Sequence, residues 1–177
     1  PFQESNRELS YSLDLKVPTA ERQGAAEVYV CAYFLLRDAR STQQFWIGPS
    51  LFDLRGAERF PDTVHVDNWE GGTNLPVLFM ALDQRSAWLH PGPGSAEFAD
   101  RPFREYRHFD FRLRPAELRT AIVAMKKRMS KLAAVSEEPR DYQLVHFCLN
   151  PEIHAPAGSH GKLGLALRDL RVELLGP

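Results

Sequence analysis

The sequence predicts an all-β protein, mainly antiparallel, in which two sheets form a sandwich and one α-helix is inserted late in the chain. Segments in which apolar and polar residues alternate recur along the sequence, as strands with one covered face require. Many of these segments are separated by turns of hairpin length, and only one stretch has the apolar spacing of a helix. This order of elements is not that of a βαβ fold.

The strand predictions differ in how the strands are covered. The segment 9–17 alternates strictly, and Pro18 is expected to end it. The segment 27–36 is continuously apolar, which indicates a strand near the middle of a sheet, covered on both faces. In the last strand the apolar phase changes near Arg168 and Asp169, as one extra residue in a β-bulge would cause. The other expected strands are 43–48, 50–55, 63–67, 76–82, 105–113, 141–149 and 163–175.

The expected helix runs from Pro115 to about Leu132. Its apolar residues recur at every third or fourth position, and Pro115 suits the first helical position. The last turns are rich in Lys and Arg, which we interpret as a solvated face that suits a helix C-terminus rather than as a nucleic-acid patch.

Composition indicates one soluble domain that spans residues 1–177. Hydrophobic residues make up 44% of the 177 residues, enough for a substantial core, and the net charge of −1 favours neither nucleic acid nor an anionic membrane. No apolar run approaches the ~20 residues of a membrane span. The absence of an initiator Met predicts a secreted or periplasmic protein or one domain of a larger polypeptide.

The two cysteines, Cys31 and Cys148, lie in apolar stretches without the spacing of a metal or redox motif. We expect both to be buried and free of metal. A disulfide between them stays open, because the sequence does not place the two segments next to each other.

The order of strands resembles a jelly-roll sandwich of the kind found in carbohydrate-binding modules and lectins. The closing segment 167–174 is of the sort that ends many such domains. The resemblance covers the order of elements and no diagnostic motif. It implies a domain that binds a polysaccharide or oligosaccharide, as part of a larger polysaccharide-handling protein.

The segment 65–74 has the densest mixture of polar and aromatic residues in the chain. A sugar stacks its apolar face on an aromatic ring while its hydroxyls bind carboxylates and amides, so this mixture suits a carbohydrate site. Trp69 and Trp88 are candidate stacking platforms, with core packing as the alternative for both. Trp46, between Phe45 and Ile47, is interpreted as a core residue. The candidate ligand-binding set is Trp69, Asp67, Glu70, Asn74, Trp88, Tyr106 and His108.

Two further groups of polar residues are weaker candidates. His65 with Asp67, and His108 with Asp110, have the i, i+2 spacing that places two ligands on one face of a strand, although a zinc site needs a third. No cofactor is expected except a structural calcium ion, for which the candidate ligands are Asp38, Asp53 and Asp169. The loop 150–161 carries Glu152, His154 and His160, and could border a ligand groove.

Two other functions stay open at this stage. Asp67 and Glu70 could form the carboxylate pair of a glycoside hydrolase, or the chain could be a polysaccharide lyase. Alternatively, an exposed sheet edge and the basic helix could dock a protein partner. The sequence contains no GxSxG, P-loop or HExxH motif, which disfavours the corresponding hydrolase, nucleotide and zinc-protease chemistries.

Overall fold

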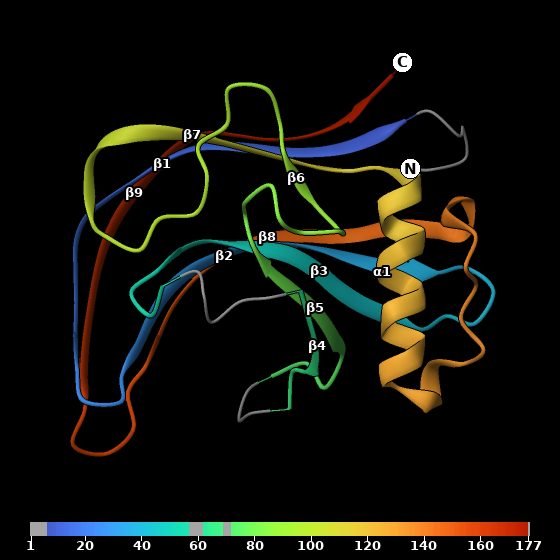
Figure 1. Cartoon of the computed structure of the whole chain (residues 1–177), viewed down its shortest axis with the longest axis horizontal. Helices are drawn as coiled ribbons and strands as arrows, with labels where there is room; N and C mark the ends of the chain where they lie inside the picture. The colour runs from blue at the N-terminus through green and yellow to red at the C-terminus, as the bar shows by residue number, and fades with distance from the viewer. Residues whose placement is uncertain (1–6, 57–61, 69–71, 177) are drawn as a thin grey trace.

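The computed structural model describes residues 7–56, 62–68 and 72–176. In this part of the chain the protein is mainly β, with a four-stranded sheet, a five-stranded sheet and one α-helix (Figure 1). The strand orders are β6-β7-β1-β9 and β4-β5-β3-β2-β8. The elements are β1 (Glu8–Gln23), β2 (Glu27–Asp38), β3 (Gln44–Asp53), β4 (Thr63–Val66), β5 (Pro76–Ala81), β6 (His90–Pro91), β7 (Phe103–Leu113), α1 (Pro115–Arg128), β8 (Tyr142–His154) and β9 (His160–Leu175), with short 3-10 turns at Ser130–Leu132 and Pro139–Asp141.

The prediction of a mainly antiparallel fold is confirmed, with one exception. β3 and β5 pair in parallel, from Trp46 opposite Val77 to Ser50 opposite Ala81. The chain reaches this arrangement because β4 lies between them in sequence and forms an antiparallel hairpin with β5 at the edge of the sheet.

The prediction that Pro18 ends the first strand is wrong, because β1 continues to Gln23. Beyond Val17, β1 no longer pairs with β7, and its pairing with β9 shifts register between Lys16 and Thr19. A proline has no backbone N–H to donate, and an irregular point in the ladder accommodates it without breaking the strand.

The predicted bulge in the last strand is confirmed. Ser12 pairs with Arg171 and Asp14 with Arg168, so β9 has one residue more than β1 in this interval. Asp169 lies in this interval and adopts a positive φ of 53°, a conformation that Asp tolerates better than most residues. The extra residue explains the change of apolar phase in the sequence.

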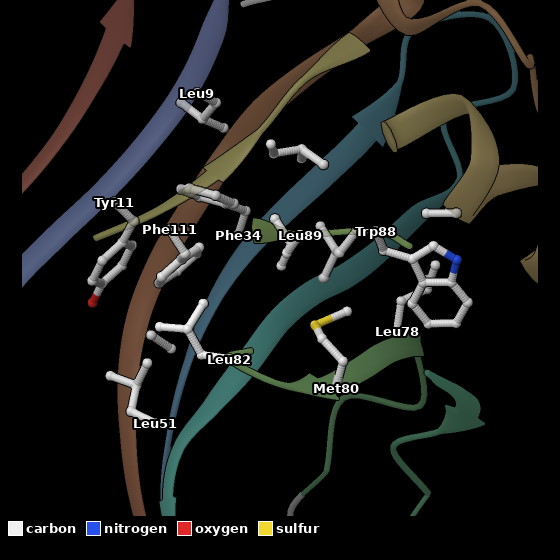
Figure 2. Packing of buried hydrophobic residues seen from close by; sticks show 14 of the residues in the cluster. Leu9, Tyr11, Phe34, Leu51, Leu78, Met80, Leu82, Trp88, Leu89 and Phe111 are labelled. Atoms are coloured by element: carbon white, nitrogen blue, oxygen red, sulfur yellow. The ribbon is translucent and has the colours of Figure 1, made fainter. Parts of the chain in front are cut away.

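Both sheets contribute to one hydrophobic core. Leu9 and Tyr11 from β1 and Phe111 from β7 lie against Phe34 from β2, and Leu78 from β5 belongs to the same cluster (Figure 2). The ring centroids of Tyr11 and Phe34 lie 5.8 Å apart, which is edge-to-face packing across the two sheets. The core therefore fills the space between the inner faces of the sheets, and each sheet keeps an outer face.

The helix α1 ends earlier than predicted. It begins at Pro115 and ends at Arg128, and Met129 is extended. Leu132 belongs to the following 3-10 turn and is still buried, at 2% exposure. The apolar spacing therefore continues past the helix because the next turn also packs on the core.

The two cysteines are both free thiols, but only Cys31 is buried as predicted. Cys148 is half-buried on β8. Within the described residues, no helix is both long enough and apolar enough to cross a lipid bilayer.

Candidate functional site

The candidate site is a cavity of about 340 Å³ on the outer face of the five-stranded sheet, opposite the core. Every strand of this sheet contributes at least one side chain to it, and Asp67, Gly72 and Thr73, between β4 and β5, line it as well. The described lining residues are Tyr29, Tyr33, Trp46, His65, Asp67, Gly72, Thr73, Val77, Cys148, Asn150 and Glu152.

Strand register brings these side chains together. Tyr29 lies opposite Glu152, and Tyr33 lies opposite Cys148, in the pairing of β2 with β8. On the other side of the sheet, Val77 lies between Trp46 of β3 and His65 of β4. Directly paired residues point to the same face, so the lining forms a row across the sheet, while Val30 and Phe34 point into the core.

Hydrogen bonds join Asp67 and Thr73, which lie between β4 and β5, to Trp46 of β3. The Trp46 Nε1–H donates to Thr73 Oγ1 at 3.1 Å, and the Thr73 hydroxyl donates to Asp67 Oδ2 at 2.7 Å. The backbone N–H of Thr73 also donates to Asp67 Oδ2, at 2.6 Å. These hydrogen bonds hold the Trp46 indole in position and orient the Asp67 carboxylate.

Glu152 is held on the opposite side of the cavity by two neutral donors. The Tyr29 hydroxyl donates to one carboxylate oxygen, and the Asn150 side-chain amide donates to the other. Burial, together with the hydrogen bond to Glu152, raises the pKa of Tyr29 far above its usual value. Tyr29 therefore stays a neutral hydrogen-bond donor over the whole physiological pH range.

The apolar part of the cavity is aromatic. The rings of Tyr33 and Trp46 lie 6.2 Å apart, centroid to centroid, at an angle of 64°. Beneath them, Cys31, Val77 and Phe79 form a second buried cluster that is separate from the main core. This cluster supports the rings, so they offer firm apolar surfaces to the cavity.

His65 adds a titratable group at the edge of the cavity. Partial desolvation lowers its pKa, and the neighbouring Asp67 carboxylate offsets part of this effect. The imidazole is therefore neutral at pH 7 and can both donate and accept a hydrogen bond.

A second cavity of about 280 Å³ adjoins the first and shares Tyr29, Tyr33 and His65 with it. Arg55 lines this cavity, with its guanidinium carbon 5.1 Å from the centre of the Tyr29 ring. Arg55 is ion-paired with Asp53 at 2.7 Å and with Glu27 at 2.6 Å. The two adjoining cavities are called the groove below.

The structure places the sequence-predicted residues of the 65–74 segment in different ways. Asp67 lines the groove. Asn74 does not line it, but its backbone N–H donates to Asp67 O at 2.6 Å and its positive φ of 58° forms the turn that returns the chain to β5. Trp69 and Glu70 lie outside the described residues, as does the pairing of Asp67 with Glu70.

The remaining predicted residues lie away from the groove. Trp88 is 4% exposed and packs in the main core, so the prediction that it binds ligand is wrong (Figure 2). Tyr106 and His108 are on the outer face of the four-stranded sheet, where Arg168 and Lys16 lie over the Tyr106 ring. The His108 ring pairs with Asp14 at 2.9 Å. Tyr106 and His108 therefore belong to the other sheet.

The candidate calcium ligands lie apart, and each has partners in the protein. Asp38 is fully buried and accepts hydrogen bonds from Ser41 and Ser136, among others. Asp53 pairs with Arg55, and Asp169 lies 3.6 Å from Arg168. In the described ranges, His, Cys, Asp and Glu side chains nowhere gather in a group of three that could hold a metal ion.

Sequence reasoning placed Trp46 in the core, and the structure corrects this interpretation. Because β3 is apolar on both faces, its sequence does not indicate that Phe45 and Ile47 belong to the main core while Trp46 packs against the second cluster on the opposite face. Tyr29 and Tyr33 were missed in the same way, although their alternation with Val28, Val30 and Ala32 was a usable signal. Glu152 was named from its loop, whereas His154 and His160 do not line the groove.

Comparisons of the chain with models of protein families, with curated proteins and with solved structures found no match.

Proposed function

We propose that the groove binds a carbohydrate, in the form of an oligosaccharide or a segment of a polysaccharide. The observation that carries the proposal is the lining of the larger cavity, in which the Tyr33 and Trp46 rings stand between the hydrogen-bonding groups of Asp67 and Glu152. A sugar ring needs an apolar platform for its C–H face and polar groups for its hydroxyls.

The hydrogen-bonding groups are of the types that suit hydroxyl ligands. Asp67 and Glu152 are acceptors, and His65 and Asn150 can both donate and accept. Each carboxylate is already oriented by protein donors, which lowers the entropy that ligand binding would otherwise cost. The polar lining is thus arranged in advance of binding.

The presence of two adjoining cavities favours more than one sugar unit. The cavities have volumes of about 340 and 280 Å³ and share three lining residues, which supports a ligand with a unit in each. We propose that units in the larger cavity stack on Trp46, and that the next unit contacts Tyr29 and Arg55.

The fold that we propose for this function is a two-sheet sandwich of jelly-roll type. In a jelly roll, a long antiparallel pair of strands is rolled so that both of its arms contribute to each sheet. The pairing of β1 with β9 in one sheet and of β2 with β8 in the other supports this interpretation.

The experiment is isothermal titration of the protein with a panel of neutral, acidic and amino oligosaccharides. Trp46→Ala should weaken binding of the ligand found by at least about tenfold, equivalent to about 1.4 kcal/mol, because stacking and the hydrogen bond to Thr73 are both lost. Trp46→Phe keeps a ring but not the Nε1–H, so a smaller loss is expected. Thermal melts of both variants separate binding from folding.

The matched control is Tyr106→Ala, which removes an aromatic ring from the outer face of the other sheet. It should leave affinity within about twofold of the unchanged protein. If no oligosaccharide binds, or if Tyr106→Ala abolishes binding while Trp46→Ala does not, the proposed site is wrong. Release of reducing ends during the same incubation would indicate an enzyme instead of a binding domain.

A further inference from the structure

The charged side chains in the described lining of the larger cavity are carboxylates. Asp67 and Glu152 line it, and the described lining contains no Lys or Arg. The His65 imidazole, which also lines this cavity, is neutral at pH 7 because desolvation lowers its pKa. A ligand that enters this cavity therefore meets two carboxylates and neutral groups.

The described side-chain hydrogen bonds to the two carboxylates come from neutral groups. Among the described residues, the partners of Glu152 are Tyr29 and Asn150, and the partner of Asp67 is Thr73. These are neutral donors, in contrast to the partner of Glu27 in the adjoining cavity, which is Arg55. None of these described partners brings a positive charge to the carboxylate that it contacts.

The aromatic walls of the cavity also favour a positively charged ligand. The face of an aromatic ring carries negative electrostatic potential and attracts ammonium and guanidinium groups. Arg55 over the Tyr29 ring is an instance within this groove. The Tyr33 and Trp46 rings pack edge to face, with their centroids 6.2 Å apart, so an ammonium group contacts them from the cavity side and does not fit between them.

We infer that the sugar unit in the larger cavity carries a protonated amine, so that the ligand class is an amino sugar such as a glucosamine oligomer. The inference rests on the proposed carbohydrate function and specifies its substrate class. The ammonium group donates a charge-assisted hydrogen bond to one of the two carboxylates that line the cavity, Glu152 or Asp67, and such a bond is stronger than that of a hydroxyl. A uronic acid at the same place would put a third carboxylate beside two others.

The test uses three tetramers in the same titration: β-linked glucosamine, β-linked N-acetylglucosamine and α-linked galacturonate. The glucosamine tetramer should bind at least about tenfold more tightly than the N-acetylated tetramer, because acetylation removes the charge. The galacturonate tetramer should bind most weakly. Tetralysine is the control for a polycation without sugar rings, and it should compete poorly.

Glu152→Gln should remove most of the preference for glucosamine, since it removes the charge and keeps a similar shape. Asp67→Asn is the second variant, in case Glu152→Gln disturbs the contacts with Tyr29 and Asn150. The matched control is Glu173→Gln, which removes one exposed carboxylate from β9 in the other sheet. It should leave the preference unchanged.

The outcomes separate this inference from the proposed function. If the N-acetylated or galacturonate tetramer binds as tightly as the glucosamine tetramer, the inference is wrong and the carbohydrate function stands. The inference is also wrong if tetralysine competes equally or if Glu173→Gln has the effect expected of Glu152→Gln. If none of the three tetramers binds, the inference is wrong, and the other oligosaccharides of the panel decide whether the carbohydrate function stands.

Discussion

Single carboxylates organise much of this protein, and Asp38 is the most constrained of them. It is fully buried at the end of β2 and accepts backbone hydrogen bonds from Arg40 at 3.0 Å and Ser136 at 3.0 Å, with the Ser41 hydroxyl at 2.6 Å. Burial alone would raise the pKa of this carboxyl, but the hydrogen bonds outweigh it and hold the pKa below its ordinary value of 3.8. Asp38 thereby joins the turn after β2 to the segment that follows α1.

Asp38→Asn should lower the free energy of unfolding by about 2 kcal/mol at pH 7, the range for hydrogen bonds to a buried charge. Because the pKa is lower in the folded state, this stabilisation is present above the unfolded value of 3.8 and is lost as the pH falls through the folded value. Urea denaturation at pH 7 and below pH 3.8 should therefore show a difference between the proteins that shrinks in acid.

The control for this prediction is Asp169→Asn, at the exposed bulge of β9. Asn tolerates the positive φ at this position, and the ion pair with Arg168 is exposed, so a change within about 0.5 kcal/mol is expected. A loss from Asp38→Asn that does not vary with pH would contradict the assignment of its effect to the charged carboxylate.

At the scale of elements, the groove depends on how closely β2 and β3 approach each other. A Cβ at Gly48 would lie 1.9 Å from Ala32 O and 2.7 Å from Tyr33 Cα, so any side chain here must push the two backbones apart. Trp46 lies two residues before Gly48 on β3, on the same face of the sheet. Gly48 thus sets the separation of the two aromatic walls of the larger cavity.

Gly48→Ala should lower the free energy of unfolding by about 2 kcal/mol, since overpacking against backbone atoms forces the strands to move. It should also weaken ligand binding at temperatures where the variant is folded. Thermal melts and titration calorimetry measure the two effects. Gly176→Ala, where an added Cβ meets nothing within 4 Å, should change neither. Equal stability of the two variants would contradict the close approach.

The elements also show what the sequence could and could not predict. Alternation placed β1 and β7 correctly, because their outer faces are polar and their inner faces are apolar. β3 is buried on both faces, so its hydrophobic pattern carried no information about which face Trp46 would join. The parallel pairing of β3 with β5 had no local signal either, since it depends on contacts between segments distant in sequence.

The candidate site shows the same limit. Its side chains come from five strands and a loop, and Tyr33 and Cys148 meet only through the register of β2 with β8. A dense local segment revealed Asp67, but residues scattered over 124 positions, from Tyr29 to Glu152, share no sequence motif. Tyr106 was taken for a site residue because an aromatic on an alternating strand looks the same on either sheet.

At the scale of the whole molecule, the two sheets share a core and differ in their outer faces. Their inner faces share one core, to which α1 adds Leu118, Ile122 and Met125. The outer face of the four-stranded sheet is crossed by ion pairs such as Asp14 with Arg168 at 3.1 Å. The outer face of the five-stranded sheet instead has the groove, with its aromatic lining and its own buried support of Cys31, Val77 and Phe79. This difference is the physical basis for assigning ligand binding to one face only.

The central claim, that a carbohydrate binds in this groove, is tested most directly by following the tryptophan indole N–H signals in a nuclear magnetic resonance titration. The signals are assigned with Trp→Phe variants, and an oligosaccharide found by calorimetry is added. The Trp46 signal should shift in proportion to occupancy because its Nε1–H lies at the groove, whereas the signal of Trp88, 4% exposed in the core, should stay in place. Saturable binding that leaves the Trp46 indole signal in place would contradict the account. Binding of unchanged affinity in Trp46→Ala would contradict it as well.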